Sequence, residues 1–202
     1  LSREPVPGTG PRILGVDVAR MGSDRTVLVL RQGRVVEHIK IYAKHDTMEV
    51  VGFVVAVLDA WRLGVVRVDL IGVGSGVHDR LAELRRLGRI TVVIEGVDVS
   101  AAAPPKAPAD DMQAHRLRDY LWMQTAAWLR DAAPIFGADD RESCEDLAGE
   151  LTAVRYTFTS DGALQVEDKD AMRKRLGHSP DLADALCLTF APPTTLPAVD
   201  LS

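Results

Sequence analysis

The sequence predicts a single α/β domain in which a mixed β-sheet is covered by helices. Three β-rich runs open the chain, and the short turn between the second and the third is typical of an antiparallel hairpin. Strand-like and helix-like segments then alternate, which favours parallel strands with helices packed on the sheet. With 202 residues, 47% of them hydrophobic, the chain is long enough to bury one full core.

The first three strands are predicted from short apolar runs that are rich in β-branched residues. The runs are RILGVDV (12–18), RTVLVLR (25–31) and RVVEHIKIYA (34–43). Gln32 and Gly33 separate the second run from the third and predict a tight turn, because glycine adopts the backbone conformations that hairpin turns need. We therefore expect an antiparallel meander at the start of the sheet.

The middle of the chain is predicted to alternate between helices and strands. Apolar residues recur with helical spacing after a predicted N-cap, and short β-rich runs follow the glycines that end each helix. The predicted elements are a helix from Thr47 to Trp61, a strand over 65–72, a helix over 76–87 and a strand over 89–96. This order adds parallel strands to the meander and gives a mixed sheet flanked by helices.

The second half of the chain begins with a loop and is mostly helical. Residues 96–112 are small, polar and rich in proline, which is typical of a loop. Helical spacing predicts helices over 112–132 and 142–151. Alternating residues on both sides of the turn SDG predict an extra β-hairpin over 153–167.

The final predicted element is a helix in the segment SPDLADALCLTFA. Ser179 is a predicted N-cap, and Pro180 suits the first helical position. Leu182, Leu186 and Phe190 recur on one face of this helix, so we expect that face to lie on the core.

Composition restricts the class of protein. The chain has 24 Lys and Arg and 29 Asp and Glu, and a net charge of −5 is not typical of a general nucleic-acid binder. No apolar run approaches the roughly 18 residues that span a bilayer, so we expect no membrane association and a cytoplasmic location. Cys144 and Cys187 are not spaced as metal ligands, and we interpret Cys187 as a core thiol.

The two ends of the chain are expected to lie outside the folded domain. Residues 1–11 are rich in proline and glycine, and we interpret them as the remnant of a linker in a longer protein. We expect one domain over residues 12–192 and a C-terminal tail over 193–202.

Several carboxylates stand in settings that favour a function. Asp17 ends the first strand, Asp69 lies near the end of the fourth, and Asp181 and Asp184 share one side of the last helix, opposite its leucines. If the first and fourth strands are parallel neighbours, Asp17 and Asp69 lie together at one edge of the sheet. Clustered carboxylates repel one another, and a hard divalent cation relieves that repulsion. Two Mg²⁺ or Mn²⁺ ions about 3.5–4 Å apart would suit the hydrolysis of a phosphodiester by water.

Simpler explanations exist for some of these features. Asp181 lies in a first helical turn, where a negative charge complements the helix dipole, and Asp24 has the position of an ordinary turn acid. The glycines of GVGSG (72–76) are similar to a dinucleotide-binding loop, but the later glycine of that fingerprint is missing. We interpret them as a tight turn that lets the next helix pack close to Asp69.

Four segments, in order, resemble the nuclease domain of the large terminase subunit of tailed bacteriophages. They are ILGVDVARMGSDRTVLVL, VDLIGVGSGVHDRL, RYTFTSDGALQVE and EDKDAMRKRLGHSPDLADAL, and the resemblance covers residues 12–192. It implies a ribonuclease H-like fold and metal-dependent endonuclease cleavage of concatemeric viral double-stranded DNA during genome packaging, in the host cell cytoplasm. It also implies an N-terminal ATPase domain in the same polypeptide, with the small terminase subunit and the portal as further partners.

The same resemblance implies roles for particular residues. Two divalent cations, Mg or Mn, would be held by catalytic Asp17, Asp69 and Asp184, with Asp181 as an auxiliary ligand. The hairpin is expected beside the site, where it can steer DNA.

A basic segment next to the hairpin is the predicted DNA contact, since DNA binding needs positive surface. It contains Lys169, Arg173, Lys174 and Arg175. Residues Arg85, Arg86 and Arg89 are a second basic group, for which a solvated helix end is the simpler explanation.

Three other functions remain open from the sequence. Junction resolvases and transposase cores are ribonuclease H-like enzymes that also use clustered carboxylates. A non-catalytic docking module of the same fold would need none of this chemistry. A sugar-kinase-like ATP-binding half would use GVDVARMGSDRT as a phosphate loop, although a second such loop is missing downstream.

Overall fold

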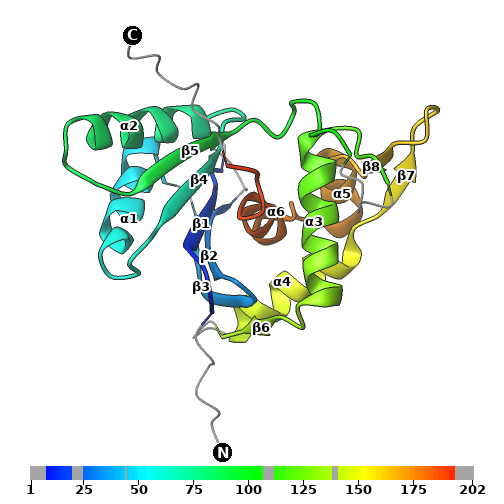
Figure 1. Ribbon diagram of the computed structural model, residues 1–202, viewed down its shortest axis with the longest axis horizontal. Coiled ribbons are helices and arrows are strands. Elements are labelled where there is room, and N and C mark those ends of the chain that lie inside the picture. The colour runs from blue at the N-terminus through cyan, green and yellow to red at the C-terminus, as the bar shows by residue number, and fades with distance from the viewer. Residues whose placement is uncertain (1–7, 20–24, 44, 107–111, 138–140, 194–202) are drawn as a thin grey trace, which may run out of the picture.

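The computed structural model describes residues 8–19, 25–43, 45–106, 112–137 and 141–193 (Figure 1). Its strands are β1 (Arg12–Asp17), β2 (Arg25–Gln32), β3 (Val35–Ala43), β4 (Val65–Asp69), β5 (Val93–Val97), β6 (Ile135–Phe136), β7 (Tyr156–Phe158) and β8 (Leu164–Val166). Its helices are α1 (Thr47–Leu58), α2 (Gly74–Arg86), α3 (Leu117–Asp131), α4 (Arg141–Ala153), α5 (Lys169–Leu176) and α6 (Asp181–Leu188). The expected linker and tail lie largely outside the described residues, as does Asp24.

The central sheet is mixed, as predicted. Its strand order is β5-β4-β1-β2-β3-β6, and β2 is antiparallel to both of its neighbours, β1 and β3. Strands β4 and β5 are parallel extensions beside β1, and β6 is parallel to β3. The predicted meander is therefore confirmed, and the parallel pairing of β1 with β4 brings the ends of these two strands together.

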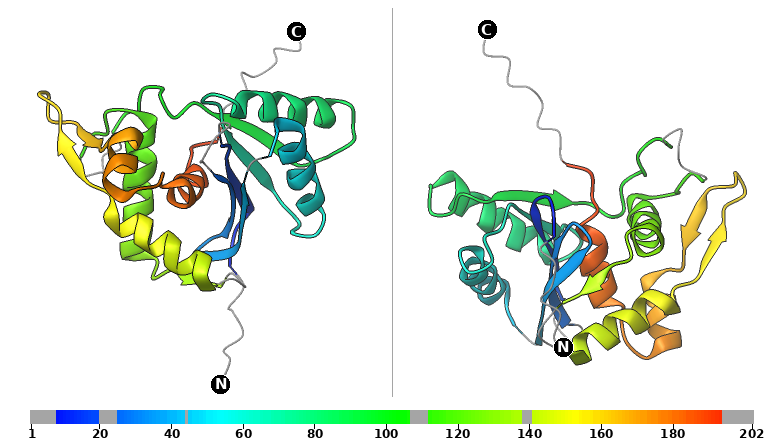
Figure 2. Two further views of the ribbon diagram at one scale, coloured as in Figure 1. Left: turned by 180° about the vertical axis from the view of Figure 1, so that it is seen from behind. Right: turned by 60° about the horizontal axis from the view of Figure 1, so that its bottom comes forward.

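Helices cover both faces of this sheet (Figures 1 and 2). Helices α1 and α2 pack on one face. Helix α6 lies on the other face against β1 and β2, and α3 and α4 pack on the outer side of α6. Helix α6 is consequently enclosed between the sheet and other helices, so that its leucine face and the opposite face with Asp181 and Asp184 are both covered.

Asp46, and not Thr47, is the N-cap of α1. The Asp46 Oδ1 atom accepts the backbone N–H of Glu49 at 2.9 Å, and Glu49 Oε2 accepts the N–H of Asp46 at 2.8 Å. This reciprocal pair is a capping box, so Thr47 is the first helical residue. The predicted cap was wrong by one residue, and the helix ends at Leu58, three residues before the predicted end at Trp61.

Other element boundaries differ from the predicted ones for local reasons. Helix α3 begins at Leu117 because the residues before it pair with distant backbone instead: Ala114 forms a bridge with Leu164, and Arg116 forms one with Ala102. The two-residue strand β6 was not predicted, since only its pairing with β3 defines it.

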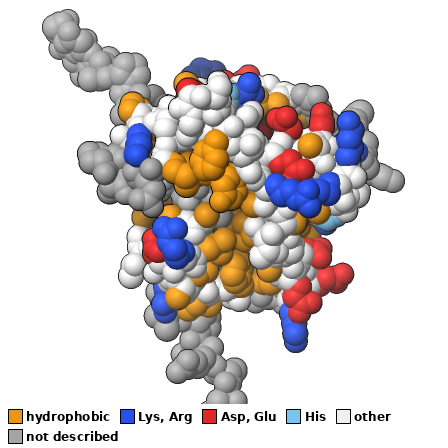
Figure 3. Space-filling view, turned by 90° about the vertical axis from the view of Figure 1, so that its right-hand side faces the viewer, with side chains coloured by type: hydrophobic (Ala, Val, Ile, Leu, Met, Phe, Trp, Pro, Cys, Tyr) orange, Lys and Arg blue, Asp and Glu red, His pale blue; other side chains and the backbone are white. Residues whose placement is uncertain are grey.

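The predicted hairpin is confirmed as β7 and β8, which form a separate two-stranded sheet. Tyr156 and Phe158 of β7 are 63% and 53% exposed. Figure 3 faces this side of the molecule, and apolar side chains are visible across it.

Among the described residues, no helix combines the length and the hydropathy that a membrane span requires.

Candidate active site

Helix α6 lies directly on β1 because β1 has a glycine at the contact. A β-carbon at Gly15 would overlap with the carbonyl oxygen of Ala185 in α6. Residues two apart on a strand face the same side, so Asp17 points toward the layer of α6 as Gly15 does. Asp17 is 5% exposed and ends β1 beside the first turn of α6.

Asp69 ends β4, the parallel neighbour of β1. Its Oδ1 atom accepts the backbone N–H of Ile71 at 2.9 Å, which fixes the carboxylate in the turn after the strand. Helix α2 starts at Gly74, where a β-carbon would overlap with the carbonyl oxygen of Asp69. The interpretation of the glycines as a device for close packing is therefore confirmed at Gly74.

Asp181 and Asp184 lie in the first turn of α6, and neither faces open solvent. Asp181 is 3% exposed, and its Oδ2 atom accepts the backbone N–H of Arg25 at 3.3 Å. The Asp184 side chain is 15% exposed, and its Oδ1 atom accepts the indole N–H of Trp122 at 3.3 Å. The predicted face opposite the leucines thus exists, but it points into the protein.

Lys169, from the start of α5, lies among these carboxylates. Its Nζ atom is 3.0 Å from Asp17 Oδ2, 3.3 Å from Asp181 Oδ1 and 3.1 Å from Asp184 Oδ2. The sequence predicted Lys169 as one of the DNA-binding residues of the basic segment next to the hairpin. In the structure its ammonium group pairs with three carboxylates from β1 and α6.

The environment shifts the pKa values of the four ionisable groups at the centre of this cluster in different directions. Burial, followed by the neighbouring acids, raises the pKa of Asp17 to about 7, although Lys169 opposes the shift. Burial also raises the pKa of Asp69 to about 6. Burial acts in the same sense on Asp184, but Lys169 and Arg118 outweigh it and hold the pKa of Asp184 below its usual range. The carboxylates oppose the effect of burial on Lys169 and raise the pKa of its ammonium group.

The donor set suits a hard divalent cation, which prefers carboxylate oxygen atoms. In the arrangement present, no three His, Cys, Asp or Glu side chains of the described residues are close enough to hold an ion directly. Lys169 lies between the oxygens that would have to converge. A divalent cation would therefore compete with the Lys169 ammonium for the same carboxylates.

Sequence reasoning missed several residues that hold the cluster in place. Arg118 donates from Nη1 to the carbonyl of Glu167 at 2.8 Å, and its Nη2 lies 3.7 Å from Asp184 Oδ1. With Trp122 it orients Asp184 from the α3 side. Both residues lie in the segment 112–132, which the sequence predicted only as a helix. Its helical spacing does not indicate a contact with Asp184.

Both ends of α6 are bound by charged residues from other elements. Glu150 of α4 is 2% exposed, and its Oε2 atom accepts the N–H of Ala183 at 2.9 Å, while Oε1 forms an ion pair with Arg25 at 3.1 Å. The predicted N-cap Ser179 makes no such bond, and Pro180 occupies the N-cap position. A distant carboxylate therefore does the capping.

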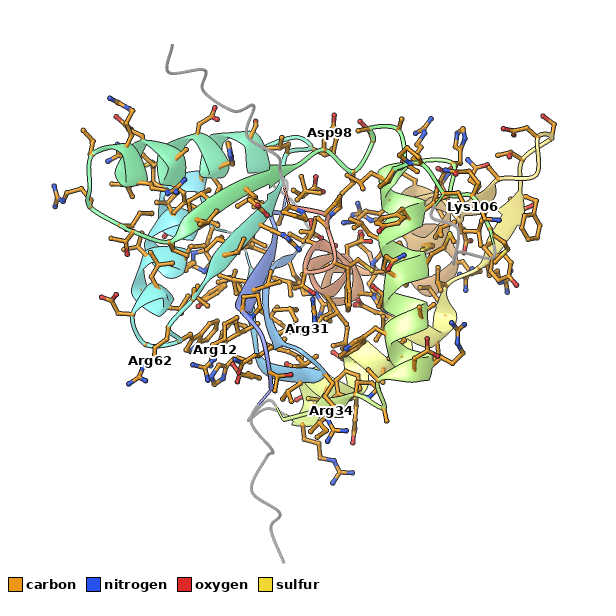
Figure 4. All side chains as sticks on the ribbon, in the orientation of Figure 1. Arg12, Arg31, Arg34, Arg62, Asp98 and Lys106 are labelled. Atoms are coloured by element: carbon orange, nitrogen blue, oxygen red, sulfur yellow. The ribbon has the colours of Figure 1, made fainter. Side chains whose placement is uncertain are left out.

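At the C-terminal end of α6, two arginines bind one carbonyl. Arg31 Nη2 and Arg67 Nη1 donate to the Thr189 carbonyl at 2.8 and 2.9 Å. Figure 4 labels Arg31, which is partly buried and lies close to α6. Arg67 also pairs with Glu95 at 2.9 Å. Positive charge at a helix C-terminus complements the dipole, so these contacts fix the position of α6 and of its acids.

A cleft of about 740 Å³ opens over the carboxylates. Its lining residues include Asp17, Asp69, Asp181, Asp184, Lys169, Ser100, Arg116, Arg118, Arg173 and Lys174. Of the predicted DNA-binding residues, Arg175 does not line the cleft and is bound internally to Glu167 and to the carbonyl of Ala153. None of Arg85, Arg86 and Arg89 lines it either.

The fold is that of known terminase nuclease domains. The gp2C part of the large terminase subunit of bacteriophage Sf6, solved as a lysine-to-alanine mutant with calcium, matches with a TM-score of 0.81 and 21% identity over 94% of this chain and 92% of that one. The same domain of Sf6 with manganese and β-thujaplicinol matches with a TM-score of 0.79 and 19% identity, over 93% and 90%. The large terminase nuclease of the thermophilic phage G20c with magnesium gives 0.56 and 17%, over 89% and 79%.

At these identities the likeness establishes the ribonuclease H-like fold that the sequence predicted. No protein-family model matches the chain, and no curated protein does.

Proposed function

We propose that this chain is the nuclease domain of a large terminase subunit, which cuts double-stranded concatemeric DNA during packaging of a viral genome. The observation that supports this most is the convergence of Asp17, Asp69, Asp181 and Asp184 from three elements of this fold beside one cleft. Burying several carboxylates together costs free energy unless a cation balances their charge, and a bound divalent ion would do so. The solved neighbours include domains with bound calcium, manganese and magnesium.

In this proposal Asp17, Asp69 and Asp184 hold two Mg²⁺ or Mn²⁺ ions, and Asp181 is an auxiliary ligand. Bound divalent ions lower the pKa of water and stabilise the charge that develops on a phosphodiester in the transition state. The raised pKa values of Asp17 and Asp69 mean that these groups must lose their protons before they can bind an ion.

The surrounding residues prepare the carboxylates for this task. Lys169 balances their charge when no divalent ion is present, which keeps the cluster compact. Trp122 and Arg118 hold Asp184 Oδ1, so that Oδ2 is the oxygen shared with Lys169 and is the one that an ion would take over. Groups that orient a metal ligand in this way typically change metal affinity about 10- to 100-fold when removed.

The wider setting is part of the proposal. The domain would act in the host cell cytoplasm, joined to an N-terminal ATPase domain and assisted by the small terminase subunit and the portal. A junction resolvase or transposase core remains the alternative enzyme, and the hairpin beside α5 favours the terminase. A docking module would have no use for buried acids paired with a lysine.

Cleavage of supercoiled plasmid tests the proposal. The chain is incubated with Mg²⁺, Mn²⁺, Ca²⁺ or EDTA, and nicked and linear products are measured. We expect cleavage with Mg²⁺ or Mn²⁺ and none with EDTA. Equal cleavage in excess EDTA would exclude a metal-dependent mechanism, and absence of cleavage under all conditions would favour a docking module.

A further inference from the structure

Arg116 lines the cleft from the start of α3 and is held in an unusual way. Its backbone N–H donates to Asp119 Oδ2 at 2.8 Å, and its carbonyl accepts the N–H of Tyr120 at 3.0 Å. It also pairs with Ala102 in an isolated antiparallel bridge, and the next N–H, from Leu117, donates to the Ala101 carbonyl at 2.8 Å. The backbone at Arg116 is therefore fixed from two sides.

The side chain of Arg116 contrasts with this backbone. The residue is exposed, and its guanidinium group makes no hydrogen bond or ion pair with the part of the chain that the structure describes. A rigid backbone that presents an unpaired cation to a cleft is suited to binding an anion. Asp119 links the Arg116 backbone to the hairpin, because its second oxygen accepts the N–H of Val166 in β8 at 2.8 Å.

Lys174 lines the same cleft from α5 and is also exposed without a partner among the described residues. Two other basic residues of α5 are already paired. Lys169 contacts three carboxylates, and Arg175 is bound to Glu167. Asp168 and Asp170 line the α5 part of the cleft as well, so Lys174 offsets local negative charge there. Asp119, close to Arg116 in sequence, is buried and accepts backbone N–H groups.

The charge of the cleft explains why such cations are needed. The carboxylates repel a DNA backbone, and the whole chain has a net charge of −5. Backbone phosphates must be attracted by local cations if DNA is to approach the acids, and arginine binds phosphate in a fixed planar geometry.

We infer that Arg116 and Lys174 bind backbone phosphates of double-stranded DNA on its way to the carboxylates. This inference rests on the proposed nuclease function, and it moves the predicted DNA contact away from Lys169 and Arg175. Contacts of this kind carry no sequence preference, because they go to backbone phosphates and not to base edges.

Salt-dependent DNA binding tests the inference without any cleavage. A fluorescein-labelled duplex is titrated with protein in EDTA, starting at low salt, and fluorescence anisotropy gives Kd at each salt concentration. We expect Arg116→Gln and Lys174→Gln each to weaken binding roughly 3- to 10-fold near 0.1 M salt and to flatten the slope of log K against log salt by about 0.9. Arg89→Gln is the matched control, since Arg89 is exposed but lies outside the cleft.

The outcomes separate this inference from the proposed function. Unchanged slopes in both cleft variants, or no binding by the wild type at low salt, would overturn the inference. If both variants behave as expected but no metal supports cleavage, the phosphate site stands and the nuclease proposal fails. In an active enzyme the variants should raise KM and leave kcat unchanged, while thermal melting confirms that they fold.

Discussion

The two faces of the central sheet are built from alternate residues of the same strands. One face is apolar, and the other carries buried charged side chains. Strand β1 contributes Leu14 and Val16 to the core under α1 and α2, and strand β4 contributes alternate valines to it. The alternate residues of these strands, which are Gly15 and Asp17 on β1 and Arg67 on β4, lie on the side of α6. Among the described residues, the α1–α2 core contains no buried charged side chain, whereas the face under α6 contains several.

This difference shows how one sheet separates stability from chemistry. The apolar face is stabilised by burial alone and needs no specific partners. On the other face each buried charge has a defined partner, and together these contacts hold α6 by both ends. Buried ion pairs add little stability compared with apolar packing, so we attribute them to positioning of the α6 acids.

The largest effect is expected from the acids of the charged face. Asp17→Asn and Asp184→Asn should each reduce plasmid cleavage at least about a hundredfold, because loss of a direct ligand should exceed the loss seen when an orienting group is removed. Initial rates in Mn²⁺ measure this. Either variant cutting at the wild-type rate would remove that residue from the site.

The same two variants should differ in stability, which serves as an internal control. The site disfavours the ionised form of Asp17, so the neutral Asn should leave the melting temperature of the metal-free protein unchanged or higher at pH 7.5. The site favours ionised Asp184, so Asp184→Asn should lower it. Equal shifts in both variants would contradict the electrostatic account of the cluster.

A substitution on the apolar face should lower stability and leave cleavage activity unchanged. Leu30→Ala, at a fully buried position of the α1–α2 core, should lower the free energy of unfolding by about 2–5 kcal/mol. Cleavage per folded molecule should stay near the wild-type value, because no charged group moves. Urea unfolding and cleavage at low temperature measure the two quantities. A large loss of activity in the folded variant would show that the two faces are coupled.

A smaller effect is expected where the sheet touches α6. Gly15→Ala forces a methyl group against the Ala185 carbonyl, which should destabilise the fold by about 1–3 kcal/mol and also reduce cleavage as α6 shifts. The matched control is Gly149→Ala on α4, where an added β-carbon meets nothing within 4 Å. That change should stabilise the protein by about 0.5–1 kcal/mol and leave cleavage unaltered. Normal cleavage by Gly15→Ala would argue against a fixed α6.

The smallest effect concerns pH and again belongs to the charged face alone. The pKa values of Asp17, Asp69 and Glu150 are raised to about 7, 6 and 8, mainly by burial. Between the ordinary pKa of these acids and the raised one, the folded protein keeps protons that the unfolded chain has released, so stability falls as pH increases. Melting of the metal-free protein should therefore shift downward from pH 5 to pH 8, and less so in Asp17→Asn. An upward shift would contradict these assignments.

The parts of the fold that depend on local pattern were predictable. Alternation and turn residues predicted the meander and the hairpin, and the strand-end positions of Asp17 and Asp69 predicted their meeting once β1 and β4 paired. The role of Lys169 was not predictable, because a lysine in a basic segment has the same sequence signature whether it faces solvent or three carboxylates. Glu150 was missed for a similar reason, since it caps a helix from a different part of the chain.

We propose that the acids around α6 form a divalent-metal site in which the Lys169 ammonium group takes the place of the metal ion while no ion is bound. Titration with Mn²⁺ tests this, because the electron paramagnetic resonance signal of the free ion measures how much Mn²⁺ stays unbound. We expect the wild type to bind Mn²⁺, Asp17→Asn and Asp184→Asn to lose that binding, and Lys169→Gln to bind more tightly because the competing ammonium is gone. Equal Mn²⁺ binding by the wild type and the two aspartate variants, or no binding by any of them, would contradict the claim.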